Sequence, residues 1–253
     1  MTIAIFAYDT VDSNWSDNLL DGDGSTLGIQ TFAANYSNRI GQAWQSWSDN
    51  MTDPGWSSFG TIFFRPQPIF SDIQFDNDGC IVMSFKDRTG DQLSASNYSP
   101  TGISSLQSAQ IQGDILRATP TIDALGRPTS FFIEDNGIAP SGPTLPIART
   151  GGLSNNQGPG GGEFYVGDGH PTFANHNESS QGAALIVPGK TTTLITAMDP
   201  LHFNSGGVRT LSNNAGNTGN LWSAYENIAP YTMLSKANGL GALEALAEVA
   251  PAD

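Results

Sequence analysis

The chain has 253 residues, with 24 acidic and 10 basic side chains and a formal net charge of −14. This charge argues against nucleic-acid binding, which needs clustered Lys and Arg, and against binding to an anionic membrane surface. Charged residues make up only 13% of the chain, which disfavours long surface helices and a charge-rich disordered chain. No stretch approaches the roughly 20 apolar residues that membrane insertion as a helix requires. A single cysteine excludes an intrachain disulfide.

Apolar and polar residues alternate with a period of two, which predicts an all-β fold of antiparallel strands. Two hairpins are predicted at 73–85, around Asp78-Gly79, and at 183–198, around Pro188-Gly189, because a Gly turn between β-rich runs is a strong hairpin signal. The stretch 240–249 fits a helix and a final strand equally well. In chain order, the other predicted strands are 3–8, 28–32, 61–64, 114–119, 130–134, 163–166, 207–212 and 231–235.

Each hairpin is followed by an Asp-containing turn, a long excursion and a third strand, GDILRAT at 113–119 and GGVRTLS at 206–212. This repeat predicts four-stranded antiparallel units in series, which is how the blades of a β-propeller are built. A β-sandwich is the alternative. We therefore predict a single all-β domain or partial propeller over 1–253, with approximate units 1–65, 66–138 and 160–253 and long loops at 35–60 and 139–162.

Several segments, taken together and in order, resemble the β-propeller-like region of large bacterial surface proteins that carry serine–aspartate-repeat-type B domains. The segments are SDIQFDNDGCIVMSFKDRTGDQ (71–92), GDILRAT (113–119), GGGEFYVGD (160–168), GAALIVPG (182–189), TTLITAMDP (192–200), SGGVRTLSN (205–213) and KANGLGALEALAE (236–248). Cys80 and Ala242 depart from the pattern of that family, which has a small polar residue and Asp at these places. The resemblance implies an extracellular, non-enzymatic surface protein and a chain that corresponds to the C-terminal part of the propeller.

The turn of the first hairpin carries two candidate metal ligands, Asp76 and Asp78. Carboxylate oxygens are the ligands that Ca²⁺ prefers, so bound Ca²⁺ is one expectation here. The turn is no EF-hand, because Phe85 stands where the bidentate Glu of that motif would be. The alternative is an ordinary hairpin turn with solvated carboxylates.

A second polar cluster contains Glu163, Asp168 and Glu178, interspersed with His170 and His176. Imidazole and carboxylate groups together suit a metal ion. The spacing matches no standard helical motif, so three alternatives stay open: a metal site, the active site of a metal-dependent hydrolase, and a hydrogen-bonded loop.

Trp44, Trp47 and Trp56 lie close together in the predicted loop 35–60. Aromatic rings with polar rims can stack on sugars, so these three residues are the candidate ligand-binding set of a carbohydrate-binding module. The alternative is that they pack the loop onto the core.

Arg88 is flanked by acidic residues and is expected to tie strand ends together as an ion pair. Cys80, in mid-strand, is expected to be a buried small apolar residue.

The function favoured by the sequence is an extracellular cell-surface module that is structural or adhesive and not an enzyme. Recognition or scaffolding would use long loops on a rigid sheet scaffold. Because open sheet edges pair with other chains, we expect self-association or pairing with missing propeller blades. Surface glycans are the partner under the carbohydrate-binding alternative, and neither nucleic acid nor membrane insertion is expected.

Overall fold

The computed structural model describes residues 47–51, 57–59, 62–93, 95–100, 106–109, 113–133, 164–165, 180–198, 205–216, 218–226 and 242–245. Within these residues the fold is all-β, as predicted, and only one short helix accompanies the strands. In chain order the elements are β1 (Ser57–Phe59), β2 (Ile62–Phe64), β3 (Pro68–Phe75), β4 (Ile81–Asp87), α2 (Arg88–Leu93), β5 (Ala95–Tyr98), β6 (Leu106–Ala109), β7 (Asp114–Ile122), β8 (Pro128–Ile133), β9 (Ser180–Ile186), β10 (Thr192–Met198), β11 (Ser205–Ser212) and β12 (Thr218–Glu226).

Two four-stranded antiparallel sheets dominate the fold: the first meander, β3-β4-β7-β8, and the second meander, β12-β11-β10-β9. Both predicted hairpins are confirmed as β3–β4 and β9–β10. Gly79 and Gly189 have φ angles of 77° and 80° at their turns, a backbone region that glycine enters without steric cost. The predicted third strands are also confirmed, because β7 pairs with β4 and β11 pairs with β10.

A small sheet with the order β1-β2-β6-β5 departs from the prediction. Its β2–β6 pair is parallel, whereas we expected only antiparallel units. The predicted strand 61–64 is confirmed as β2, but β1 lies inside the predicted loop 35–60, and β5, β6 and helix α2 were not predicted. Segments of three to six residues are too short for a clear hydrophobic period to emerge. The fourth strand of the second meander, β12, was not predicted either.

Two further predictions differ from the structure, and several lie outside the described residues. Phe164 and Tyr165 form a bend, although a strand was predicted at 163–166. Residues 242–245 are neither helix nor strand, whereas we expected one of these over 240–249. The predicted strands at 3–8, 28–32 and 231–235 and the predicted loop at 139–162 fall outside the described residues. The unit boundaries and the choice between propeller and sandwich stay predictions.

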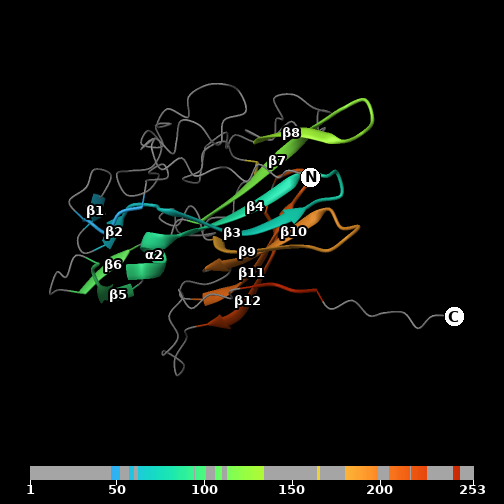
Figure 1. The fold of residues 1–253 in the computed structure, drawn as a ribbon. Helices are drawn as coiled ribbons and strands as arrows, with labels where there is room; N and C mark the ends of the chain where they lie inside the picture. Colours follow the sequence, from blue (N-terminus) through green and yellow to red (C-terminus); the bar gives the residue numbers. More distant parts are fainter. Residues whose placement is uncertain are drawn as a thin grey trace.

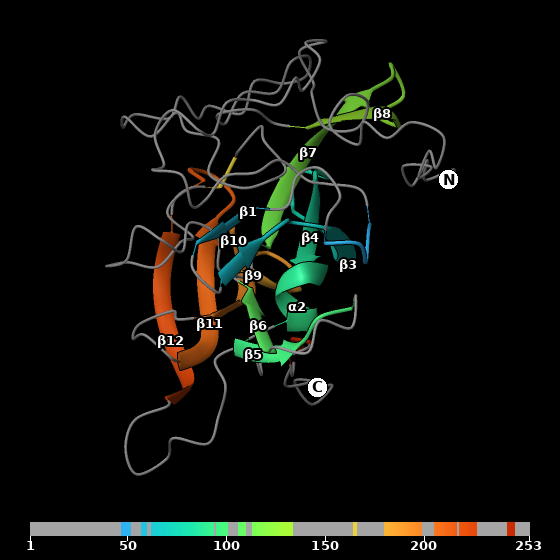
Figure 2. The ribbon, with the colours of Figure 1, turned by 90° about the vertical axis from the view of Figure 1, so that its left-hand side faces the viewer.

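The two meanders meet at their first strands and separate toward their fourth strands. Figures 1 and 2 show β3, β4 and β9 together near the centre, with β8 and β12 on opposite sides of the molecule. Buried side chains from both meanders and from the bend 164–165 fill the junction, and each of the larger apolar ones stabilises the fold by about 1.5–3 kcal/mol. They are Val82, Ile115, Phe164, Tyr165, Ala184, Ile186, Ile195 and Leu211.

Polar side chains of β3 cap the edge of β9 along this junction. Ser71 Oγ donates to the carbonyl oxygen of Gly182 at 2.6 Å, and Asp72 Oδ2 accepts from the backbone N–H of Ala184 at 2.9 Å. Both β3 and β9 are edge strands of their sheets, and uncapped edge groups invite pairing with other chains. The contacts advance in the same direction along both strands, so β3 and β9 run parallel.

Replacing Gly182 by Ala tests how tightly this junction is packed. A Cβ at Gly182 would lie 2.0 Å from Lys86 Cγ and 2.6 Å from Ser71 Oγ, at a φ of +91°. Gly189 is the matched control, because its φ is +80° but nothing lies within 4 Å of its Cβ position. We expect Gly189→Ala to cost about 1–2 kcal/mol of backbone strain in urea unfolding. Gly182→Ala should cost about 1–3 kcal/mol more, and equal losses would contradict the close packing.

Candidate functional site

The site begins with the five-residue turn 76–80, in which Asp76 organises the backbone. The N–H of Asp76 donates to the carbonyl of Cys80 at 3.0 Å, and the N–H of Gly79 donates to the carbonyl of Asp76 at 3.0 Å. Asp76 Oδ1 accepts from the N–H groups of Asp78 and Cys80, both at 2.9 Å. A short acidic side chain that binds its own following backbone is a well-known turn device, and here it fixes the end of the hairpin.

The other carboxylate oxygen of Asp76 pairs with a buried arginine from the middle of β7. Arg117 donates from Nε at 2.9 Å and from Nη2 at 2.5 Å to Asp76 Oδ2. The two side chains are 0% and 2% exposed, so neither charge is solvated. The guanidinium carbon also lies 4.6 Å from the ring centroid of Phe164. The expectation of solvated carboxylates in this turn is therefore wrong for Asp76, although Asp78 is 55% exposed and lies 3.8 Å from Arg117.

A second turn, 123–127, has the same hydrogen bonds in a different setting. Asp123 Oδ1 accepts from the N–H groups of Leu125 and Arg127 at 2.8 and 2.9 Å. Its ion pair is made with Arg127 of the same turn, at the surface. Hydrogen bonds from the backbone and the side chain of Arg127 hold the pKa of Asp123 below its ordinary value. The two Asp-x-x-Gly turns thus share their backbone hydrogen bonds, but Asp76 pairs with a buried arginine and Asp123 with an exposed one.

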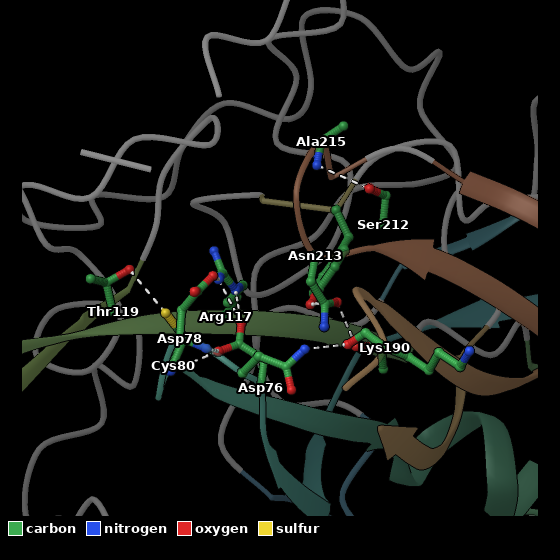
Figure 3. A network of polar contacts seen from close by, with 12 residues as sticks. Asp76, Asp78, Cys80, Arg117, Thr119, Lys190, Ser212, Asn213 and Ala215 are labelled. Atoms are coloured by element: carbon green, nitrogen blue, oxygen red, sulfur yellow. Dashed lines mark hydrogen bonds and ion pairs between the residues drawn. The ribbon is translucent and has the colours of Figure 1, made fainter. Parts of the chain in front are cut away.

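Asn77 joins this turn to the turn of the second hairpin. Its side chain donates from Nδ2 to the carbonyl of Lys190 at 2.9 Å and accepts at Oδ1 from the N–H of Gly189 at 3.1 Å. Asn213 continues the network, because its Oδ1 accepts from Tyr165 Oη at 2.9 Å and from Thr193 Oγ1 at 2.7 Å. Figure 3 shows these contacts running from the Asp76 turn past Lys190 to Asn213.

The predicted metal ligands are only partly described. Asp76 and Asp78 share one turn, but Glu163, Asp168 and Glu178, with His170 and His176, lie outside the described residues. Within the described part of the chain, no group of three or more His, Cys, Asp or Glu residues gathers to hold a metal. Both oxygens of Asp76 already accept hydrogen bonds, and the Arg117 cation beside them would repel Ca²⁺. Calcium binding stays a prediction.

Of the predicted aromatic platform, Trp47 is described and Trp44 and Trp56 are not. The Trp47 ring is 52% exposed, yet its Nε1 donates to the carbonyl of Pro68 at 2.8 Å. The guanidinium carbon of Arg88 lies 5.3 Å from the ring centroid, within the range of a cation–π contact. Trp47 is thus an anchored indole that remains accessible, and it is not packed into the core.

Arg88 ties chain segments together, as predicted, but through other partners. It pairs with Asp49 and donates to Gln67 Oε1 at 3.1 Å. Asp87 accepts from the backbone N–H groups of Gln67 and Thr89, at 3.0 and 2.9 Å. The fully buried Gln67 thereby links the 47–50 segment to α2.

Neither Arg117 nor Gln67 was predicted as a functional residue from the sequence. A lone arginine in the apolar strand 114–119 was the only available signal for a buried ion pair. Nothing in the sequence singles out Gln67. Cys80 is buried, as predicted, and its Sγ lies 3.6 Å from Thr119 Oγ1.

Comparison with known proteins finds two similar eukaryotic proteins, both from Dictyostelium discoideum. The chain is 28% identical to colossin-B over 224 residues, which cover 83% of the chain and 5% of colossin-B. It is 25% identical to colossin-C over 241 residues, which cover 94% of the chain and 21% of colossin-C. The chain therefore spans a small part of the length of these relatives. No family model and no solved structure matches it.

These similarities correct the resemblance drawn from the sequence. The proteins found are colossins of a eukaryote, so the assignment to bacterial surface proteins with serine–aspartate-repeat-type B domains is wrong. The segments that suggested it are largely hairpin strands and Gly or Asp turns, which any antiparallel fold can share. Among the described residues, no helix is long and apolar enough to cross a membrane.

Replacing Asp76 by Asn tests the buried ion pair. The substitution leaves the Arg117 cation without its counter-charge in a dry environment, so we expect a loss of about 3–5 kcal/mol in the free energy of unfolding. Asp123→Asn is the matched control, because it alters the same turn at the surface and should cost much less. Chemical unfolding followed by tryptophan fluorescence measures both.

Equal losses for the two variants would show that turn geometry, and not the buried charge, carries the stability. The double variant Asp76→Asn/Arg117→Met should recover part of the loss, since no uncompensated charge remains.

The calcium prediction is checked by thermal unfolding of the unmodified chain in calcium and in chelator. An unchanged melting temperature would contradict calcium binding.

Proposed function

We propose that the chain is a structural module of a longer extracellular protein and has no catalytic activity. The similarity to colossin-B and colossin-C supports this, because it extends over 83% and 94% of the chain but over only a fraction of those proteins. A module repeated or embedded in a long protein is expected to hold its neighbours in fixed positions. A surface or adhesive role is the finer form of this proposal.

The observation that carries the proposal is the junction between the two meanders. A buried apolar cluster and side chain to backbone hydrogen bonds fix one sheet against the other. The buried ion pair fixes the turn 76–80 to β7 within the first meander, where Arg117 contacts Phe164 of the shared cluster. Each carboxylate oxygen of Asp76 already accepts two hydrogen bonds, which leaves this group no spare acceptor capacity for a substrate. The metal-dependent hydrolase based on Glu163, Asp168 and Glu178 stays an untested alternative.

An extracellular location can be checked on intact cells that produce the protein. We expect a membrane-impermeant amine-reactive biotin reagent to label the chain before lysis, because Lys190 lies exposed in the turn of the second hairpin. A cytosolic protein from the same cells is the control for leakage. Labelling that occurs only after lysis would contradict the extracellular proposal.

Carbohydrate binding is a second candidate, favoured by the state of Trp47. An indole that is 52% exposed and held by a hydrogen bond to Pro68 and by Arg88 offers a rigid apolar face. Exposed Asp49 beside it supplies a carboxylate that could accept hydrogen bonds from sugar hydroxyls. Surface glycans are the ligands of this chemistry.

A glycan array probed with the purified chain tests this candidate. We expect Trp47→Ala to abolish binding by removing the stacking surface, while its exposed position keeps the fold intact. Tyr98→Ala is the matched control, because Tyr98 is another exposed aromatic residue, at 70%. Absence of glycan binding by the unmodified chain, or equal loss in both variants, would remove the candidate.

A further inference from the structure

The sequence contains five Asn-x-Ser/Thr motifs, the acceptor motif for N-linked glycans. Such a short motif also arises by chance in a chain rich in Asn and Ser, so exposure and local structure decide which copies can carry a glycan. Two of the acceptor residues, Asn50 and Asn97, lie in the described part of the chain, and both are exposed. Only at Asn97 is the whole motif described, as Asn97-Tyr98-Ser99.

The side chain of Asn97 is held in place and still has a hydrogen to exchange. Asn97 lies in β5, the outer strand of the small sheet. Its Oδ1 accepts from the N–H of Tyr98 at 2.8 Å, and its Nδ2 donates to the carbonyl of Gln92 at 2.9 Å. The amide nitrogen carries two hydrogens, so the second has no partner among the described residues. A glycan replaces one hydrogen, which allows Asn97 to keep its bond to Gln92.

The surface beside Asn97 is open and partly apolar. Tyr98 pairs with Leu106 across β5 and β6, and the two residues are 70% and 50% exposed. Sugar rings have apolar C–H faces that pack against aromatic rings. Within the described sheet β5 is also an edge strand, and such edges pair with other chains unless they are covered. A bulky, hydrophilic glycan at this place would shield both the apolar pair and the edge.

We propose that Asn97 is the acceptor of an N-linked glycan that is added before the small sheet folds. The inference rests on the proposed extracellular location, because the motif is used in secreted proteins. The sugar comes from a lipid-linked oligosaccharide diphosphate. Asn97 Nδ2 forms a bond to C1 of the first sugar, the bond between C1 and the diphosphate oxygen breaks, and Nδ2 releases one proton. The lipid diphosphate is the leaving group.

The third residue of the motif sets the order of modification and folding. The transferase requires a hydroxyl group at this position, which Ser99 supplies. In the folded chain Ser99 is only 5% exposed, so the enzyme cannot reach its hydroxyl group. Asn97 stays exposed after folding and holds the glycan outside the structure. Transfer therefore precedes the pairing of β5 with β6.

Production of the full chain in cultured eukaryotic cells, behind a cleavable secretion signal, tests the site. We expect peptide mass spectrometry to find a glycan on Asn97, and an amidase that releases N-glycans to convert Asn97 to Asp. Ser99→Ala should abolish this glycan while the acceptor is unchanged, and Ser99→Thr should retain it. Asn220 is the internal control, because it is exposed in β12 but is followed two residues later by Trp222. It should stay unmodified.

Chain retained inside the cells is analysed together with the secreted chain. Because transfer precedes folding, retained chain reports the occupancy of Asn97 even where Ser99→Ala impairs folding. An unmodified Asn97 in the unaltered chain would overturn the proposal, as would a glycan that persists in Ser99→Ala.

The order of events has its own test in a purified reaction. Folded chain produced in bacteria, mixed with purified oligosaccharyltransferase and its lipid-linked donor, should stay unmodified at Asn97. A standard acceptor peptide in the same reaction shows that the enzyme is active. Glycosylation of the folded chain would contradict the assigned order. The added secretion signal forces entry into the pathway, whereas labelling of intact cells reports where the natural chain lies, so the two results stand or fall separately.

Discussion

The fold depends on one interaction, the buried ion pair between Arg117 and Asp76. Taking two charges out of water is costly, and the arrangement is stable only where attraction and hydrogen bonds compensate for lost hydration. Asp76 achieves this with four hydrogen bonds, two from its own turn and two from the guanidinium group. The ring of Phe164 covers the guanidinium group at 4.6 Å. One carboxylate thus fixes a hairpin turn, the third strand of the same meander and a residue of the shared core.

The second constraint is the open edge of β9, which the first meander covers with side chains instead of a strand ladder. Backbone pairing would have merged the two meanders into one continuous sheet. Ser71 and Asp72 satisfy the edge groups individually and leave the sheets free to diverge toward β8 and β12. Asn77 adds the same kind of contact at the turns. Each of these bonds has directional requirements, so together they select one alignment of the two meanders, which apolar contacts alone would specify poorly.

The first three strands of each meander could be predicted from the sequence because the hairpin signals are local, whereas β12 was missed. Alternating residues around Asp78-Gly79 and Pro188-Gly189 specify hairpins within a short stretch of chain. Of the small sheet only β2 was predicted, since strands of three or four residues show little period and the parallel β2–β6 pair joins residues far apart in sequence. The partner of Asp76 was equally hidden, because Arg117 lies 41 residues away and its burial becomes visible only once β7 is placed beside β4. The supposed bacterial relationship failed for a related reason: short turn and strand motifs record local geometry and not ancestry.

The acidic residues of this chain illustrate how one local motif acquires different roles from its surroundings. The turns 76–80 and 123–127 have the same backbone hydrogen bonds and a glycine with φ near +75°, so their carboxylates begin from the same geometry. The second carboxylate oxygen of Asp123 pairs with the exposed Arg127 of its own turn, so the interaction stays within that turn. The second carboxylate oxygen of Asp76 meets Arg117 in the core, and the same motif becomes the link between turn, sheet and junction. The Asp-rich turns that suggested calcium are therefore explained in part by backbone geometry and buried charge compensation. The hydrogen bonds and the ion pair of Asp76 thus hold the turn 76–80 against β7 and against Phe164, which packs into the junction between the meanders.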